Sequence, residues 1–415
     1  MSAAVVRALL ALCLVLQAGH AAAQGGESAL FGGAQVPPPN DRIQVQREGV
    51  LTVRSAVPSA QETIDIFGSN LYARNVQPVW IEVRNDSARP LIVTPMGVDP
   101  AYFSPRESAH RSASQRPLSL LNSEFEQRSV RRLSVAPDSI QSGYIFTRVD
   151  EGTKSFNVDV VGDEKPYAFT FFIPVPGLRI DHREVVFSEL YDASERRDMK
   201  LPELISELEK MPCCVVDSAG KDKGDPLNLV IIGKALDLYH AFLRAGWDET
   251  ETINRSSLWK TAASAITGGA YRYSPVSALY VFGRPQDIAL QRARGSIHLR
   301  NHLRLWLTPL TLNGTPVWIG QISRDIGVRF TWRTITTHKI DPDVDETRDF
   351  LLEDLAYAEA VEAYGFIGGV GEASYDQPRG NLTGDPYFTD GRRLVMLITD
   401  EPTSIAELKP FPLER

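Results

Sequence analysis

The sequence predicts an α+β protein with two folded parts: an N-terminal antiparallel β-sandwich of immunoglobulin-like size, followed by an α+β domain with a mostly antiparallel sheet. Two observations support this class. Short runs rich in β-branched and aromatic residues, separated by turn residues, follow one another between residues 62 and 180. Between residues 213 and 400, similar runs are mixed with two segments of helical period, which is typical of α+β domains and not of a doubly wound parallel sheet.

The N-terminus has the pattern of a secretory signal over residues 1–23. Arg7 precedes an apolar run, Ala8–Leu16, and small residues follow, so we expect cleavage after Ala23. An uncleaved anchor is the alternative, but the run is shorter than the ~20 residues of a membrane-spanning helix. We therefore expect an exported protein, periplasmic or extracellular, without a transmembrane segment in the mature chain. Residues 24–61 are rich in Gly, Pro and Gln and predict a flexible leader.

The sandwich is expected over residues 62–180. In one of its runs Val79, Ile81 and Val83 fall on one face, as a half-buried strand requires. A polar insert, Arg106–Arg132, interrupts the strands and contains six arginines. Such a charge run predicts a solvated loop, and a surface that contacts an anionic partner is the alternative.

The rest of the chain is expected to comprise a helical connector (residues 181–212), the α+β domain (213–400) and a tail (401–415). The connector has apolar residues at helical spacing over Leu201–Pro212. The domain is expected to contain a strand over Asn228–Gly233, a helix over Leu236–Ala245, strands over Val276–Phe282, Ile297–Leu307, Thr315–Val328 and Arg333–His338, a helix over Asp345–Leu355, and closing strands over Gly365–Val370 and Arg393–Thr399.

The composition is that of a globular protein, with 43% hydrophobic and 23% charged residues among 415. The formal net charge is −8 and the sequence pI is about 5.5. Because a nucleic-acid-binding protein needs a basic surface to neutralise phosphates, we expect no nucleic-acid partner.

Two cysteines, Cys213 and Cys214, remain once the signal is removed. Neighbouring cysteines are too constrained for an ordinary disulfide, so the sequence predicts a fold without a disulfide framework. A vicinal redox pair or a metal-binding pair is the alternative.

Polar residues are concentrated around one expected strand of the second domain. Its alternation places Arg300, His302, Arg304 and Trp306 on one face. Such a face is usually exposed to water. If neighbouring segments cover it, its charges need partners or a ligand, because a buried unpaired charge is costly.

Three arginines of this region are expected to converge on an anionic ligand, namely Arg284, Arg304 and Arg324. Guanidinium groups suit this role because they bind phosphate and carboxylate groups through paired hydrogen bonds. Asp287 and Asp325 complete the expected ligand-binding set. The alternative is that these arginines form ion pairs inside the domain, with Asp287, Asp325 and Asp349 as partners.

His302 and His338 are the candidates for general acid–base catalysis, because either can titrate near neutral pH. The acidic residues after His338 allow two interpretations: a metal site shared with His302, or capping of the following helix by Asp343 or Asp345. The spacing excludes an EF-hand loop, and no G-x-S-x-G or H-E-x-x-H motif occurs. We assign no metal ligand, and the residues identify no cofactor.

Several ordered blocks of the second domain resemble the LssY C-terminal domain family: GDPLNLVIIG, FLRAGW, PVSALYVFGRPQDIALQ, SIHLRNHLRLW, PVWIGQISRDIGV and THKIDPDVDETRDFLLEDL. The resemblance covers about Pro212 to Asp400. Some members of that family carry the domain beside membrane-embedded modules similar to type-2 phosphatidic acid phosphatases or DedA-like proteins, which implies an envelope setting and a connection with lipid phosphates. The resemblance implies no catalytic residue.

These features predict an exported bacterial envelope protein whose second domain binds a phosphate-bearing ligand or an envelope protein partner. Two other functions remain open. A phosphate-ester hydrolase would lose a pH-dependent turnover when His302 or His338 is replaced. A structural assembly module would lose stability, but no ligand, when Arg304 is replaced.

Overall fold

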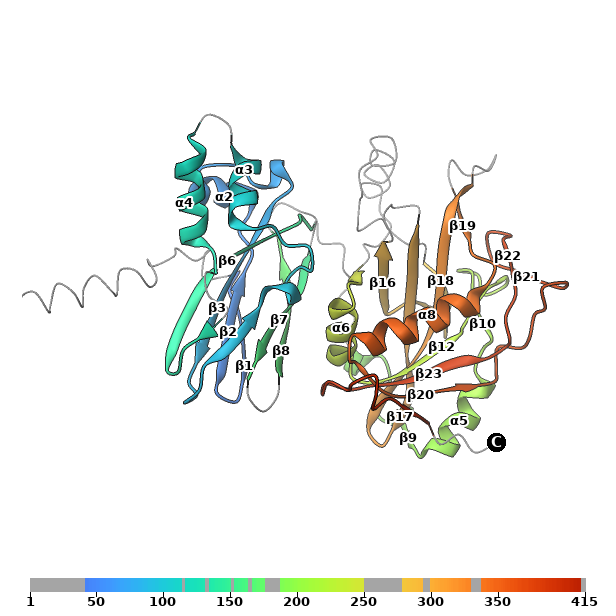
Figure 1. Cartoon of the computed structure of the whole chain (residues 1–415). Coiled ribbons are helices and arrows are strands. Elements are labelled where there is room, and N and C mark those ends of the chain that lie inside the picture. Colours follow the sequence, from blue (N-terminus) through green and yellow to red (C-terminus); the bar gives the residue numbers. More distant parts are fainter. Residues whose placement is uncertain are drawn as a thin grey trace, which may run out of the picture. The chain divides into compact units, whose positions relative to one another are not determined.

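The computed structural model describes residues 42–113, 116–130, 134–150, 153–162, 166–175, 187–249, 278–293, 299–329 and 337–411 (Figure 1). These residues form a mixed α+β protein, mostly strands, with six α-helices and largely antiparallel sheets. The chain divides into two compact units, one of Met1–Val149 with Val158–Leu178 and one of Asp150–Asn157 with Arg179–Arg415. The expected signal lies outside the described residues.

The first unit contains two four-stranded sheets (Figure 1). One has the order β1 (Gln44–Glu48), β2 (Leu51–Ala56), β3 (Gln77–Asn85) and β6 (Ser139–Thr147), antiparallel throughout. The other has the order β5 (Ser134–Val135), β4 (Leu91–Thr94), β7 (Thr153–Val161) and β8 (Pro166–Pro174), and the boundary between the units falls inside β7, after Asn157. Strands β1 and β2 lie inside the expected leader, so the prediction of a flexible segment up to residue 61 was wrong from Gln44 onward.

Three helices of the first unit pack against one face of the first sheet: α2 (Ala60–Phe67), α3 (Pro105–Ser112) and α4 (Leu118–Arg128), with short 3-10 turns at Tyr72–Arg74 and Pro95–Gly97. Helix α2 begins at a capping box, in which Ser59 and Glu62 bond each other's backbone N–H groups. The core between these helices and the sheet is aromatic, with Phe67 and Phe125 on the helices and Trp80, Tyr144 and Phe146 on the strands.

Helices α3 and α4 are formed by the polar insert, so the prediction of a solvated loop was wrong. The apolar residues of the insert, such as Phe125, are buried. Its described arginines form ion pairs with glutamates of the same insert: Arg106 with Glu126, Arg111 with Glu107, and Arg116 and Arg128 with Glu124. Their charge is therefore largely matched locally, which weakens the alternative of an anion-binding surface.

The second unit is built on a sheet of ten strands. Along the sheet lie β13 (Asp248–Glu249), β16 (Ile288–Ala293), β17 (Arg300–Leu312), β18 (Thr315–Arg329), β12 (Leu229–Ile232), β23 (Arg393–Ile398), β20 (Val361–Ile367) and β24 (Lys409–Pro410), while β19 (Thr337–Ile340) pairs with β18 and β9 (Arg197–Met199) with β17. Most pairs are antiparallel, as expected. The sheet is nevertheless mixed, because β12–β23, β9–β17 and β20–β24 are parallel.

Both faces of this sheet are covered. Helices α6 (Ala235–Arg244) and α8 (Val344–Tyr357) pack on one face, against residues such as Leu303, Leu305 and Trp318. The opposite face is covered by α5 (Leu201–Lys210) and by a small sheet of β11 (Lys223–Pro226), β10 (Cys214–Val216), β14 (Tyr280–Val281) and β15 (Arg284–Pro285). The remaining short elements are a 3-10 turn at Phe187–Glu189 and the hairpin of β21 (Arg379–Gly380) and β22 (Pro386–Tyr387). None of the described helices is long and apolar enough to cross a membrane.

Candidate functional site

A buried row of polar side chains follows β17 on the face opposite helices α6 and α8. Arg300, His302 and Arg304 are 2%, 6% and 7% exposed, and Trp306, next in the row, is completely buried. The shared face predicted from the alternation of the strand is therefore covered. Buried polar groups need partners, and the neighbouring strands supply some of them.

The pairing of β17 with β18 determines which of these side chains meet. Arg304 lies opposite Gln321, and His302 lies opposite Ser323. Because residues paired across antiparallel strands point to the same side, Gln321 and Ser323 face the row, and so does Asp325, two residues further. On the other flank, Arg300 donates to Gln291 Oε1 of β16 at 2.7 Å.

His302 forms a buried pair with Asp325. Its Nε2 lies 2.7 Å from Asp325 Oδ2. Burial lowers the pKa of His302 below its usual 6.5, although the charge and hydrogen bond of Asp325 act in the opposite direction. In the neutral ring Nε2–H donates to Asp325 and Nδ1 carries the lone pair. Within the described part of the chain, Nδ1 has no hydrogen-bond partner.

Arg304 is a buried cation with few partners. Its Nη1 donates to Gln321 Oε1 at 3.0 Å. Neither Arg304 Nε nor Gln321 Nε2 bonds any described residue. Burial lowers the pKa of Arg304 to about 10, while Asp225 and Asp325 raise it through their charge. Asp225, on β11, is also buried and accepts from Asn381 Nδ2 at 3.1 Å, and burial raises the pKa of its carboxyl.

Arg284 and Asp287 are close together, but they form an internal pair outside the row. Arg284 Nε and Nη2 donate to the two carboxylate oxygens of Asp287 at 3.0 and 2.9 Å. The same guanidinium bonds the Tyr191 hydroxyl and the Leu307 carbonyl, at 2.9 and 2.6 Å. Asp287 also accepts from the Leu307 N–H at 2.7 Å. These contacts support the ion-pair alternative for this arginine.

Arg324 lies on the other face of the sheet. It is paired with Asn301, whose side chain points away from the row. Its Nη1 donates to Glu346 of α8 at 2.7 Å, and its guanidinium carbon lies 5.4 Å from the centre of the Phe350 ring. The prediction that three arginines converge was therefore wrong: only Arg304 belongs to the buried row.

The two catalytic candidates are not seen together. The backbone of His338 pairs with Val328 in the β18–β19 ladder, but its side chain lies outside the described residues.

Of the two interpretations of the acidic segment, capping is observed: Asp343 Oδ1 accepts from the N–H groups of Asp345 and Glu346 at 3.2 and 3.1 Å. Among the described residues, no group of three or more His, Cys, Asp or Glu side chains could hold a metal ion.

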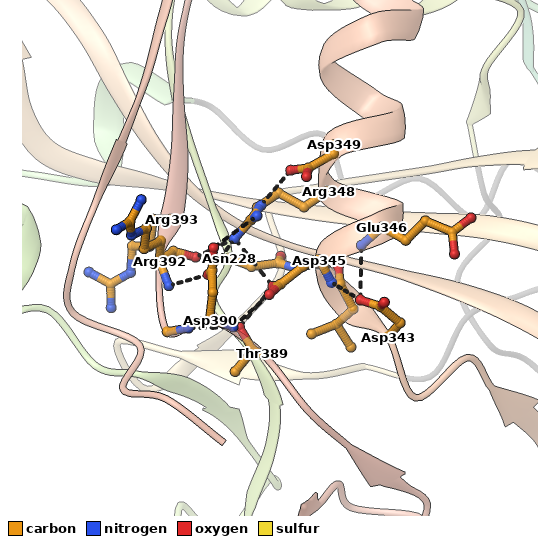
Figure 2. Close-up of polar contacts among 12 residues, drawn as sticks. Asn228, Asp343, Asp345, Glu346, Arg348, Asp349, Thr389, Asp390, Arg392 and Arg393 are labelled. Atoms are coloured by element: carbon orange, nitrogen blue, oxygen red, sulfur yellow. Dashed lines mark hydrogen bonds and ion pairs between the residues drawn. The ribbon is translucent and has the colours of Figure 1, made fainter. Parts of the chain in front are cut away.

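A second polar network, which the sequence did not reveal, surrounds Arg348 on α8 (Figure 2). Arg348 is 3% exposed and bonds the carboxylates of Asp349, Asp390 and Asp345 at 2.9, 2.8 and 3.2 Å. Asp345 also accepts from Thr389 Oγ1 at 2.8 Å. The network joins the start of α8 to the loop before β23. Three carboxylates surround one cation here, so Arg348 is neutralised and has a structural role.

Two further features surround the start of β10. Cys213 and Cys214 form a vicinal disulfide, which corrects the expectation of a fold without one. Arg393, completely buried on β23, donates to the backbone carbonyls of Leu208, Met211, Pro212, Leu227 and Gly369. An arginine as the first residue of an otherwise apolar strand was the signal for this role.

Comparison with known proteins identifies the family of this unit. No curated protein matches the chain. Residues 208–392, from the end of α5 to the residue before β23, match the family described as the LssY C-terminus. The buried row, the Arg284–Asp287 pair and the Arg348 network all lie within the matched segment. This part of the chain belongs to the LssY C-terminal domain family.

Proposed function

We propose that the LssY domain binds an anionic, phosphate- or carboxylate-bearing ligand through Arg304. One observation carries the proposal: among the described residues, this buried guanidinium forms one hydrogen bond, to a neutral amide, and no carboxylate forms an ion pair with it. Asp225 and Asp325 act on this guanidinium only through their charge, and a buried charge is costly without an anionic partner in contact. Gln321, on the same face, has an unused N–H donor to add.

Binding of inorganic phosphate and glycerol phosphate to the purified protein tests this proposal. A ligand that binds only the folded state raises the free energy of unfolding by about 2.7 kcal/mol at a hundredfold excess over its dissociation constant. We expect a rise in melting temperature that Arg304→Gln abolishes. Arg324→Gln is the matched control, because it removes an equally buried arginine from the opposite face of the same sheet. Equal shifts in both variants would reject the site, and no shift in the wild type would favour an assembly module.

A second function, hydrolysis of phosphate esters, is favoured by the His302–Asp325 pair. Asp325 holds the ring with Nε2–H toward itself, which leaves Nδ1 as a proton acceptor. Nδ1 would then act as a general base toward water beside a phosphate on Arg304. Turnover of a chromogenic phosphate monoester should be lost in His302→Gln, while phosphate binding is retained. Binding without turnover in the wild type would leave only the first function.

We also propose that this protein is exported to the bacterial envelope and that its first unit is an immunoglobulin-like sandwich that serves as a scaffold. The pattern of residues 1–23 supports export. The two four-stranded sheets support the sandwich, together with hydrogen bonds from the Gln44 and Gln46 side chains of β1 to carbonyls of β8. Sequencing of the N-terminus of the mature protein should find Gln24 first. An intact Met1 would contradict export by a cleaved signal.

A further inference from the structure

A pocket on the second unit lies apart from the buried polar row. It has a volume of about 260 Å³. Its walls come from the segment before β9, the irregular middle of β17, the start of β18 and the first turn of α6. Phe187, Leu307, Leu310 and Trp318 give it a mainly apolar lining, and Phe187 and Trp318 meet edge to face with ring centres 5.2 Å apart.

The polar atoms of the walls are bonded within the protein. Trp318 Nε1 donates to the Gly233 carbonyl at 2.9 Å, and Thr308 Oγ1 donates to Val317 at 2.8 Å. Tyr191 donates to the Leu307 carbonyl at 2.8 Å. The walls are thus fixed before any ligand arrives, and they offer few hydrogen bonds to water. A pre-formed apolar pocket of this kind favours a hydrocarbon group.

The open edge of the pocket is basic. Arg196 and Lys234 line it and are both exposed. No described carboxylate forms an ion pair with Lys234, although Asp237, one turn further along α6, acts on it through its charge. Lys234 is also the N-cap of α6. Its side chain makes no capping hydrogen bond, and the Asp237 carboxylate in the first turn accepts a hydrogen bond from the Lys234 backbone N–H. The positive end of the helix adds to the two cations at this edge, and Asp237 offsets part of that charge.

We infer that this pocket binds a single-chain amphiphile with an anionic head, either a fatty-acid anion or an alkyl phosphate. The chain fills the apolar interior, and the head lies between Arg196 and Lys234 at the first turn of α6. The inference does not depend on the anion site at Arg304, because the two sites share no residue.

A series of carboxylates of increasing chain length tests whether the hydrocarbon chain of the ligand fills the apolar interior of the pocket. Each buried methylene contributes about 0.8 kcal/mol. The affinity of the full-length protein for octanoate, nonanoate and decanoate should therefore rise about fourfold with each added carbon. The rise should stop when the pocket is full. Calorimetric titration below the micellar concentration measures it. Adsorption on an open surface would give a rise without a plateau, and no binding at any length would overturn the inference.

Two variants test the location. Ala235→Phe places a ring in the pocket and should abolish binding of decanoate, whereas Leu236→Phe is the matched control on an exposed neighbour. If Ala235→Phe does not fold, the charge variants decide instead. Lys234→Glu should weaken decanoate binding at least two- to fivefold, and Lys221→Glu, a distant exposed lysine, should not.

The nature of the head is tested with decanol and decyl phosphate. Decanol should bind more weakly than decanoate, and the difference should shrink at high salt. Equal affinities for decanol and decanoate would show that Arg196 and Lys234 do not bind the head group, and would overturn the inference that the head is anionic. Tighter binding of decyl phosphate would identify a phosphate head, and tighter binding of decanoate a fatty acid. None of these results should change in Arg304→Gln, which separates this site from the proposed function.

Discussion

His302 makes the stability of the protein depend on pH. Burial keeps it neutral in the folded state by lowering its pKa below 6.5. In the unfolded chain it takes up a proton as the pH falls through about 6.5. Below that pH the unfolded state binds more protons, so the free energy of unfolding should fall, by at most about 1.4 kcal/mol per pH unit from this residue. Above that pH the contribution is fully present.

Urea unfolding of the wild type and His302→Gln between about pH 5.5 and 7.5 measures this dependence. The advantage of the wild type should shrink as the pH falls. Asp225, whose pKa is raised by burial, titrates in both proteins and cancels from the difference. A constant difference across the range would mean that His302 has the same pKa in the folded and unfolded states, and an advantage that shrinks as the pH rises would mean that its folded pKa is raised.

Arg393 should be among the most costly residues to replace. Its donors satisfy five carbonyls in the interior, and lysine has three donors on a different geometry. We expect Arg393→Lys to lower the free energy of unfolding by about 3 kcal/mol, because buried carbonyls lose their partners. Arg392→Lys, at the exposed neighbour, should change it by less than about 0.5 kcal/mol. Similar effects at both positions would show that the carbonyl contacts contribute little.

At the scale of residues, alternation along β17 was enough to find the buried row, but Arg324 was placed on the wrong face. The hairpin contained the missing information. The two-residue turn at Asn313 and Gly314 pairs Leu312 with Thr315. Even-numbered residues of β17 therefore face the same side as odd-numbered residues of β18, which excludes Arg324. The partner of Arg284 was predictable because Asp287 is close in sequence, whereas the carbonyls bound by Arg393 come from distant segments.

At the scale of elements, the start of α8 depends on one carboxylate. Asp343 caps two N–H groups, and Asp345 and Glu346 follow in the first turn. Asp343→Ala should lower the free energy of unfolding by about 1 kcal/mol. Asp343→Asn, which keeps the capping oxygen, is the control and should lower the free energy of unfolding by only a few tenths of about 1 kcal/mol. A thermal melt of the three proteins measures the difference, and equal losses would assign the effect to charge instead of capping.

Helix α8 was predicted because the capping aspartates and the helical spacing of its apolar residues indicate the same segment. Its observed ends differ from the expected ones by one or two residues. Helices α3 and α4 were missed because the insert was judged by its charge. Ser104, Pro105 and Glu107 give a helix start that could have been recognised, and Ser104 does accept the Glu107 N–H. Strand β16 was missed because its sequence has no strong alternation. It is ordered by its pairing with β17.

At the scale of the whole molecule, the two units have separate cores, so we expect two transitions in scanning calorimetry. Phe125→Ala should destabilise the first unit by about 3–5 kcal/mol and shift one transition. Arg393→Lys should shift the other. If either variant moved both transitions together, the units would unfold as one cooperative body.

The order in which strands are made differs from their order in the sheet of the LssY domain. Strand β23 lies between β12 and β20, and its Leu394 is the parallel partner of Leu229. A ribosome that has finished β12 must therefore add all the intervening residues before the centre of the sheet can close, a delay on the order of ten seconds at usual rates of synthesis. During that interval β12 lacks one of its two partner strands, so the core of this domain cannot be completed until β23 has been made.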